Sequence, residues 1–263
     1  SIRVVDNGCG MDTEDAKKCF LRHATSKIKS EEDLEFINTL GFRGEALSSI
    51  ASVSDIEINT FKDKGIYMEL KGGEIINESV GDERKGTTIE VKDLFYNTPA
   101  RLKFLKSLNT ELANIVNLVE KLSLSNIDIS FSLYNDDKLI LKTTGNNDLL
   151  KTIFEVYGSN ISKNMVHING SNDDYEISGY VSNINVYKSN RKDMITFVNG
   201  RIIKNVFINR IIKDAYHTFL ADNKYPITII NIEVDATLID VNIHPTKQDI
   251  NITKKDNLED LLF

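Results

Sequence analysis

The sequence predicts an α+β protein of two domains, in which helices alternate with mostly antiparallel strands. Apolar residues recur at every second position in short runs typical of strands, and at helical spacing in longer runs. Tight-turn pairs such as Gly72-Gly73 and Asn199-Gly200 join neighbouring strands as hairpins. The polar stretch Gly145–Asp148 separates two such sets and predicts domains over 1–145 and 146–263. A chain of 263 residues with 41% apolar content can bury two cores.

The composition indicates a cytoplasmic protein and excludes several classes. No apolar run is long enough to cross a bilayer and no signal peptide is visible, so we expect no membrane partner. Cys9 and Cys19 are too few for a disulfide framework or a structural zinc site, and the four histidines show no ligand spacing, so we predict no metal site from them. The net charge of -7 is not that of a dedicated nucleic-acid binder, so any such contact must be local.

The chain opens on a predicted buried strand, Ile2–Val5, that runs directly into a glycine-rich turn. Asp6 stands at the strand end, and Gly8 and Gly10 follow it. The carboxylate could accept a hydrogen bond from an exocyclic amine such as that of adenine, and the glycines leave room for a purine against bare backbone. The alternative is an Asx-type turn that only closes the strand.

A helix capped by Asp12 is predicted next, with Ala16, Cys19 and Phe20 on its buried face. The loop Leu21–Ile28 that follows is rich in hydroxyl groups and cations, which suit phosphate oxygens. It could close over a nucleotide as a lid, or be a solvated connection to the next helix. The lid residues of the first alternative are Thr25, Ser26 and Lys27.

The segment Thr39–Ile50 sets a Gly-X-X-Gly turn directly before an apolar helix. Its glycines let the backbone fold tightly, and the amides of the first helical turn have no intrahelical acceptor, so an anion can bind there. A glycine pair before a helix is more often an ordinary loop, so the motif alone does not decide the matter. The residues expected at the phosphates are Gly41, Phe42, Arg43, Gly44, Glu45, Ala46 and Leu47.

The remaining elements follow from periodicity and turn residues. In the first domain we predict strands at Ile56–Thr60, Tyr67–Leu70 and Thr87–Leu94, a helix starting at Thr98-Pro99, an amphipathic helix over Glu111–Leu124, and a hairpin of Ile127–Tyr134 with Leu139–Thr143. In the second we predict helices at Leu149–Tyr157 and Val206–Phe219, with strands at Asn164–Ile168, Tyr175–Ser182, Ile195–Val198, Thr228–Val234 and Ile239–Ile243.

Lys247 is the residue of particular interest in the second domain. Pro245 stiffens the turn after the last predicted strand, so the lysine is presented from a defined place. It could reach the terminal phosphate of a nucleotide and offset charge that builds during phosphoryl transfer. A surface lysine after a turn is more often simply solvated.

Six segments resemble, in order and wording, the MutL family of DNA mismatch-repair ATPases. They are VDNGCGM (5–11), LRHATSKI (21–28), TLGFRGEALSSI (39–50), GTTIEVKDLFYNTPARLKFLK (86–106), FVNGR (197–201) and DVNIHPTKQDI (240–250). The first and third also resemble the wider ATP-binding superfamily of gyrase B, Hsp90 and histidine kinases, whereas the second and fourth narrow the resemblance to MutL and its eukaryotic relatives.

The resemblance implies a two-layer ATP-binding domain, with helices on one face of a mixed, mostly antiparallel sheet. A smaller α+β domain similar to the second domain of gyrase B and to a ribosomal protein would follow. It implies ATP and Mg²⁺ as cofactors, with Asp6 and Thr87 at the adenine end and Lys247 on the terminal phosphate as the catalytic residue. Nucleotide state would be coupled, through lid closure, to dimerisation.

The resemblance also implies partners: a MutS-type mismatch-recognition protein, downstream nicking or unwinding enzymes, DNA, and a second copy of the intact protein. Cations near the motifs are candidates for the DNA contact, although scattered lysines on an acidic protein are usually solvated. They are Arg101, Lys103, Lys106, Arg201, Lys204 and Lys213.

The family places its water-activating glutamate and its magnesium-binding asparagine on a helix before the opening strand, and Ser1 begins after that helix. We therefore expect an internal fragment, with the intact protein hydrolysing ATP and this chain alone doing so weakly. A gyrase-like ATPase is the less favoured alternative because it would lack LRHATSKI and YNTPARLKFL. A nucleotide-dependent interaction module without turnover is the other alternative.

Overall fold

The structure is a computed structural model of the chain and describes residues 1–22, 44–235, 238–240 and 251–263. Two compact units, Ser1–Ser107 and Leu108–Phe263, make up the chain. The predicted boundary after residue 145 falls inside the second unit. As a division into domains it stays a prediction.

The first unit is built on a five-stranded sheet in which all described neighbours pair antiparallel. The order across the sheet is β1-β5-β2-β3-β4. The strands are β1 (Ile2–Val5), β2 (Asp55–Phe61), β3 (Gly65–Lys71), β4 (Glu74–Val80) and β5 (Gly86–Lys92). The alternation at Ile56, Ile58 and Thr60 is confirmed as the buried face of β2, and Gly72-Gly73 forms the β3–β4 turn.

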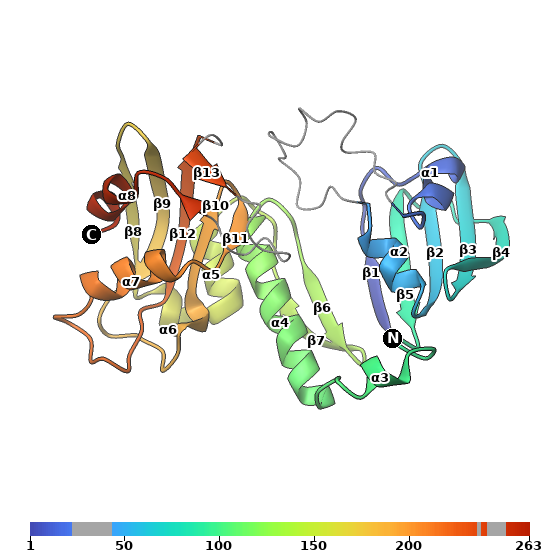
Figure 1. Cartoon of the computed structure of the whole chain (residues 1–263), viewed down its shortest axis with the longest axis horizontal. Coiled ribbons are helices and arrows are strands. Elements are labelled where there is room, and N and C mark those ends of the chain that lie inside the picture. The colour runs from blue at the N-terminus through green and yellow to red at the C-terminus, as the bar shows by residue number, and fades with distance from the viewer. Residues whose placement is uncertain (23–43, 236–237, 241–250) are drawn as a thin grey trace. The chain divides into compact units, whose positions relative to one another are not determined.

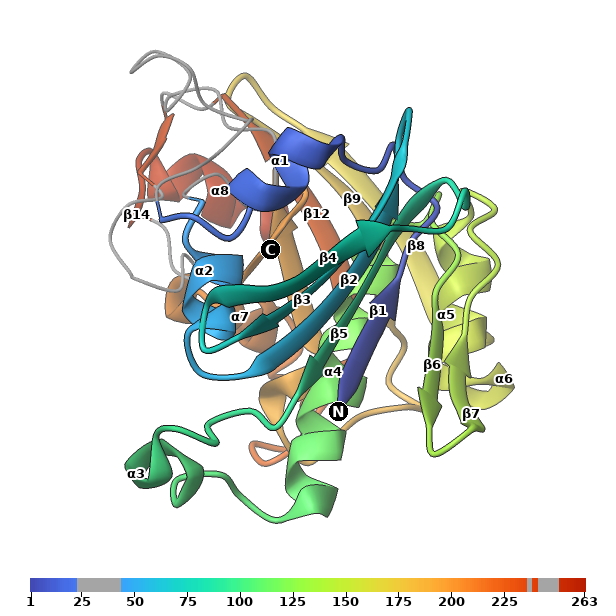
Figure 2. The same cartoon turned by 90° about the vertical axis from the view of Figure 1, so that its right-hand side faces the viewer.

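Helices α1 (Thr13–Lys18) and α2 (Ala46–Ala51) pack on one face of this sheet, whose strands lie side by side in Figure 2. Ala16 and Ala51, one from each helix, are fully buried against Ile56 and Met68. Asp12 caps α1 as predicted, because its Oδ1 accepts a hydrogen bond of 2.8 Å from the amide of Asp15. The predicted two-layer arrangement is thus confirmed for this unit.

The opening strand is formed, but the prediction that it is buried is wrong. Ile2, Val4 and Val5 are 49%, 61% and 55% exposed. The cause is position: β1 is an edge strand that pairs with β5 alone among the described strands, and the residues of the core come from β2, β3, β5 and the helices. An apolar run predicts a strand and does not reveal whether the strand lies at an edge.

The second unit is an α+β assembly around another five-stranded sheet, ordered β11-β10-β12-β9-β8 (Figure 1). β10 and β12 pair in parallel, and the other neighbours in this sheet are antiparallel. Its strands are β6 (Ser132–Asn135), β7 (Lys138–Lys142), β8 (Met165–Ser171), β9 (Tyr175–Ser182), β10 (Met194–Val198), β11 (Arg201–Ile203), β12 (Thr228–Val234), β13 (Ile239–Asp240) and β14 (Asn251–Ile252). Its helices are α4 (Leu108–Ser125), α5 (Leu149–Tyr157), α6 (Ser159–Ser162), η2 (Arg191–Asp193), α7 (Val206–Ala215) and α8 (Lys255–Leu262).

Both faces of this sheet are covered. Met194 and Ile230 face a core with Ile208 of α7 and Leu258 of α8. Ile195, Phe197 and Ile229 face a second core on the opposite side, to which α4 contributes Leu124 and α5 contributes Ile153. Every residue of β10 is therefore buried, which explains its unbroken run of mostly apolar residues.

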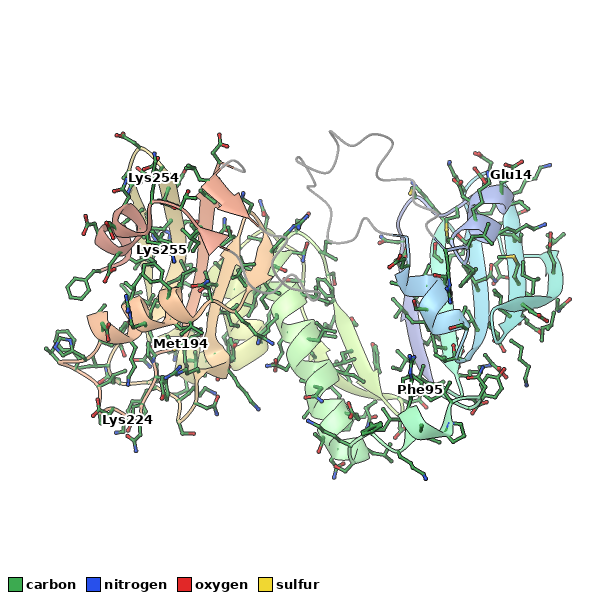
Figure 3. All side chains as sticks on the ribbon, in the orientation of Figure 1. Glu14, Phe95, Met194, Lys224, Lys254 and Lys255 are labelled. Atoms are coloured by element: carbon green, nitrogen blue, oxygen red, sulfur yellow. The ribbon has the colours of Figure 1, made fainter. Side chains whose placement is uncertain are left out.

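The last helix is fixed to the hairpin turn between β8 and β9. The Asp174 carboxylate accepts hydrogen bonds from the Lys254 ammonium and, at 2.6 Å, from the Asn257 amide. Tyr175 donates its hydroxyl to the carbonyl of Thr253 at 2.7 Å. Lys254, labelled in Figure 3, stands directly before α8, so these bonds hold the start of the helix.

Several ends of helices and strands differ from the prediction, including the start of β6, which lies at Ser132 instead of Ile127. α7 stops at Ala215 instead of Phe219, and α4 starts three residues before Glu111. The short helix α3 (Pro99–Leu102) begins where Thr98-Pro99 predicted it. Among the described residues, however, the Thr98 side chain makes no capping hydrogen bond and its buried hydroxyl has no partner. Proline in the first turn, with its fixed φ, therefore accounts for this start better than the cap does.

Candidate functional site

Asp6 is held at the end of β1 by hydrogen bonds to the start of β5. Its Oδ1 accepts from the amides of Gly8 at 2.8 Å and Thr87 at 3.2 Å, and its own amide donates to the Thr87 carbonyl at 2.8 Å. Among the described residues, none donates a hydrogen bond to Oδ2. The contact with Gly8 is the Asx-type turn considered above, so the turn and an acceptor for a ligand coexist in one carboxylate.

Two glycines permit the close backbone contacts around Asp6. A Cβ on Gly10, whose φ is +68°, would lie 1.9 Å from the Phe61 carbonyl oxygen. A Cβ on Gly86, whose φ is +103°, would lie 2.2 Å from the Asp6 carbonyl oxygen. Any larger residue at these two positions would clash with the backbone of a neighbouring strand, so both positions require glycine. Room for a purine beside Gly8 and Gly10 stays a prediction.

The Thr87 side chain faces inward, toward Thr60 of β2. The two hydroxyl oxygens lie 3.0 Å apart, and both residues are buried. Thr60 donates to the Gly86 carbonyl at 3.2 Å and accepts from the Met11 amide at 3.0 Å. Sequence reasoning missed Thr60 as part of the site, since a threonine in an alternating strand looks like ordinary β-branched filling. The buried position in the alternation was the available signal.

The helix after the glycine turn is present and short. Gly44 has φ of +62°, a left-handed conformation that suits glycine, and α2 follows directly with Glu45 as its N-cap. The Glu45 carbonyl accepts the first helical bond, from Ser49, at 3.1 Å. The amides of Ala46 and Leu47 thus precede the intrahelical ladder, as the anion-binding prediction requires.

Part of the predicted site can be placed and part cannot. Asp6, Gly8, Gly10 and Thr87 lie together at the β1–β5 end of the first unit. Gly44 to Leu47 lie at the start of α2 in the same unit. The other predicted nucleotide contacts lie outside the described residues; they are Thr25, Ser26, Lys27, Gly41, Phe42, Arg43 and Lys247.

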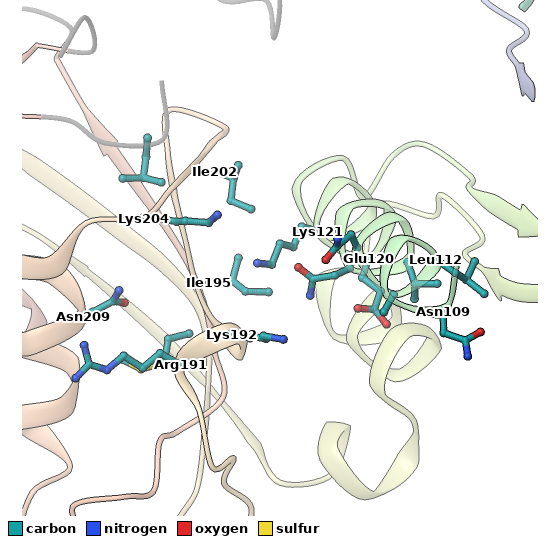
Figure 4. A pocket seen from close by; sticks show the side chains of 16 residues that line it. Asn109, Leu112, Glu120, Lys121, Arg191, Lys192, Ile195, Ile202, Lys204 and Asn209 are labelled. Carbon is teal, nitrogen blue, oxygen red and sulfur yellow. The ribbon is translucent and has the colours of Figure 1, made fainter. Parts of the chain in front are cut away.

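A pocket of about 890 Å³ in the second unit was not predicted. It lies between α4 on one side and η2, β10 and β11 on the other (Figure 4). Apolar side chains from both sides line it, including Leu112 and Ile195. Its charged lining residues are Glu120, Lys121, Arg191, Lys192 and Lys204. α4 and β11 are far apart in the sequence, so no local pattern could reveal the pocket.

The pocket concentrates positive charge in a chain of negative net charge. Burial lowers the pKa of Lys121, and the nearby Lys204 ammonium lowers it further. Burial also raises the pKa of Glu120, with the Asp193 carboxylate as a second cause. Four cations and one acid line the pocket. The repulsion between Lys121 and Lys204 would be relieved by an anion, whereas the Glu120 shift, caused by burial and by Asp193, gives no such support.

The six DNA candidates are divided between the two units. Lys204 lines the pocket, and the Lys213 ammonium lies 5.7 Å from the centre of the Tyr225 ring. Arg201 is half-buried in β11, and burial lowers its pKa. In the first unit, Arg101 lies in α3, and exposed Lys103 and Lys106 follow in the sequence. Of the six candidates, only Lys204 lines the pocket, and the others lie elsewhere in the two units.

Two kinds of feature are missing from the described ranges. No group of three or more His, Cys, Asp or Glu residues there could hold a metal ion. None of the helices in those ranges combines the length and apolarity needed to cross a bilayer. Cys9 is exposed, whereas burial raises the pKa of the Cys19 thiol to about 11.

Comparison with known proteins gives the family. Residues 153–263 match the family described as DNA mismatch repair protein, C-terminal domain. MutL from Listeria monocytogenes is 51% identical over 206 residues, which are 78% of this chain and 34% of that protein. MutL from Streptococcus agalactiae is 48% identical over 212 residues, 80% of this chain and 32% of that protein. The chain thus spans about a third of the length of these relatives.

Solved structures agree with this result. The N-terminal domain of a DNA repair protein superposes with a TM-score of 0.82 at 26% identity, covering 99% of this chain and 82% of that one. The Aquifex aeolicus MutL ATPase domain complexed with ADP superposes with a TM-score of 0.64 at 24% identity, covering 88% and 79%, and shows the fold alone. On the sequence identity to its relatives, the chain belongs to the MutL family of DNA mismatch-repair proteins.

Proposed function

We propose that this chain is the ATP-binding region of a MutL-type mismatch-repair protein, which couples nucleotide state to dimerisation and to recruitment of repair partners on DNA. The observation that carries the proposal is the Asp6 carboxylate. One of its oxygens is fixed by two backbone amides, and the other has no donor among the described residues. A fixed acceptor at a strand end suits the exocyclic amine of adenine.

The phosphates would lie at the turn before α2. The left-handed Gly44 and the amides that precede the α2 ladder supply a place for an anion, and lid residues 25–27 would close over it. Lys247 would stabilise charge on the terminal phosphate during attack by water. The described residues offer no cluster for Mg²⁺, so we propose no ligand for it among them.

Replacing Asp6 by Asn tests the adenine contact. Asp6→Asn should weaken binding of an ATP analogue about tenfold or more, because a charged acceptor is lost. The matched control is Asp63→Asn, at an exposed carboxylate in the turn between β2 and β3. Isothermal titration would report both affinities, and thermal melting would show that each variant folds. Equal affinity of Asp6→Asn and the starting chain would refute the proposal.

Turnover distinguishes an ATPase from a non-hydrolysing interaction module. In the intact protein, Lys247→Glu should lower the rate of phosphate release, because the cation near the transferring group becomes an anion. An unchanged rate would remove the proposed catalytic role of Lys247. No phosphate release from the intact protein, together with ATP-dependent self-association in sedimentation, would favour the module.

We further propose that the pocket beside α4 makes the local contact with DNA. It brings Lys121, Lys192 and Lys204 together, and neutralising phosphates releases counterions from the duplex. Lys204→Glu should weaken DNA binding and lower the salt slope of the affinity by about one. The control is Lys163→Glu, at an exposed lysine after α6. Equal losses in both variants would mean a general charge effect.

The remaining partners are proposed from family membership. A MutS-type protein and downstream nicking or unwinding enzymes would bind according to nucleotide state, and two intact copies would associate when ATP is bound. Sedimentation of the intact protein with and without an ATP analogue tests the association. A monomer under both conditions would contradict it.

A further inference from the structure

Arg84 connects the end of β1 to the start of β5. Its Nη1 donates to the Asp6 carbonyl oxygen at 2.9 Å, and its Nη2 donates to the Thr88 hydroxyl at 2.8 Å. Arg84 and Asp6 are 78 residues apart in the sequence. A planar guanidinium that bonds two strands at once fixes their relative position better than a single donor would.

All but one of the polar groups of Asp6 are hydrogen-bonded to described residues. Its amide donates to Thr87, its carbonyl accepts from Arg84, and its Oδ1 accepts from Gly8 and Thr87. Oδ2 is the one acceptor of Asp6 that no described residue uses. Apart from Gly8, these partners come from the short segment 84–87, so this segment sets where Oδ2 lies.

The Arg84 contacts lie at the end of the β1–β5 pair, where the strand pairing is easily opened. Among the described strands β1 pairs with β5 alone and has exposed side chains, so this pairing receives little support from the core. Backbone hydrogen bonds at the exposed end of such a pair fray readily. Gly86 lies against the Asp6 carbonyl oxygen and cannot close the end with a side chain. Arg84 is the side chain that does so.

We propose that Arg84 is a positioning residue for Asp6 and thereby a determinant of base selection, an inference that rests on the proposed nucleotide site. Oδ2 accepts a hydrogen bond from a 6-amino purine, whereas a 6-oxo purine presents an acceptor to the same oxygen and is repelled. The Thr87 hydroxyl faces Thr60, so the discrimination between adenine and guanine depends on Asp6. Loosening Asp6 therefore reduces discrimination against guanine nucleotides.

Arg84→Met and Arg84→Lys test the proposal, with Lys85→Met as the control that removes a neighbouring exposed charge. Titration with an ATP analogue and the matching GTP analogue gives the ratio of two affinities. Arg84→Met should weaken ATP-analogue binding about three- to tenfold and lower the ratio, because one positioned donor is lost. Arg84→Lys should recover part of the ratio, and Lys85→Met should keep it. An equal loss for both nucleotides, or no loss, overturns the base-selection role.

A second measurement needs no nucleotide. Amide hydrogen exchange at Gly8 and Thr87 reports the bonds to Asp6 Oδ1 directly. Arg84→Met should speed exchange at both amides and leave Ile58 and Met68, in the centre of the β2–β3 pair, unchanged. Unchanged exchange at Gly8 and Thr87 overturns the positioning role. A starting chain that binds no ATP analogue would refute the proposed function instead, and the exchange experiment would still decide whether Arg84 positions Asp6.

Discussion

Thr60 and Thr87 face each other across neighbouring strands, with their hydroxyl oxygens 3.0 Å apart in the buried layer of the first unit. The pair connects three segments, because Thr60 also bonds the Met11 amide and the Gly86 carbonyl. Asp6 in turn is bonded to the backbone of Thr87. The buried Thr60–Thr87 pair therefore holds the Thr87 backbone in place, and that backbone in turn holds the exposed Asp6 carboxylate proposed to bind the base.

Thr60→Val keeps the shape of the side chain and removes its hydroxyl. The Met11 amide and the Thr87 hydroxyl lose their partner, so the free energy of unfolding should fall by about 1–3 kcal/mol. Thr60→Ser keeps the hydroxyl and loses a buried methyl group, so it should retain the hydrogen bonds. Urea denaturation gives the free energies, and hydrogen exchange at Met11 should separate the variants. Protection of Met11 in Thr60→Val would contradict this account.

Gly86→Ala tests the close approach of β5 to Asp6. The added Cβ would meet the Asp6 carbonyl at 2.2 Å, and φ is +103°, so we expect a loss on the order of 3 kcal/mol or more. Gly200→Ala is the matched control, since φ is +75° but no atom lies within 4 Å of the added Cβ. Its loss should be about 1–2 kcal/mol, from the left-handed backbone alone. If urea denaturation gave the same loss of unfolding free energy for Gly86→Ala and Gly200→Ala, the contact between β5 and Asp6 would contribute nothing to the effect.

The Asp174 contacts with α8 predict a dependence of stability on acid pH. Hydrogen bonds from Lys254 and Asn257 hold the pKa of this carboxyl below its usual 3.8. A lowered folded-state pKa stabilises the protein above the unfolded value, and that contribution is lost as pH falls through the folded value. The difference in urea midpoint between the starting chain and Asp174→Asn should therefore be constant near neutral pH and shrink below about pH 4. A difference that grows in acid would refute this assignment.

The two cysteines should differ in reactivity. Burial raises the pKa of Cys19 to about 11, so little thiolate forms there at neutral pH, while Cys9 is exposed. Iodoacetamide should label Cys9 first, as read by mass spectrometry of peptides. An ATP analogue should slow that labelling, because Cys9 lies between Gly8 and Gly10 of the proposed site. Labelling of both at one rate would contradict the burial of Cys19.

Hydrophobic periodicity predicted the strands and their buried faces wherever one segment of the sequence determines both. The strands at Tyr175–Ser182 and Thr228–Val234 have the predicted ends, and alternation located the buried face of β2. Asn199-Gly200 predicted its turn because both residues take positive φ. Local sequence could not show that β1 is an exposed edge, since this depends on which strands arrive beside it.

The candidate site shows the same division. A short motif predicted Asp6, Gly8 and Gly10 as site residues, which stays a prediction, and the structure gives Gly10 and Gly86 a role against neighbouring strands. Arg84 was missed because its partners are distant in the sequence and it belongs to no pattern. Thr60 lies in the alternation of β2, but that pattern shows only that it is buried and not that it bonds Thr87, Gly86 and Met11. The pocket lined by Lys121 and Lys204 was missed for that reason too. Long-range contacts of single polar residues lie beyond sequence reasoning of this kind.

The parallel pairing of β10 with β12 has a consequence for how the second unit is made. β12 fills the place between β9 and β10, yet it leaves the ribosome after both of them and after α7. Until β12 is made, the β9 edge of the β8–β9 hairpin and the β10 edge of the β10–β11 hairpin stay unpaired, in addition to their outer edges. We expect the insertion of β12 to limit the folding rate, and chaperones that shield strand edges to improve the yield of this half of the protein.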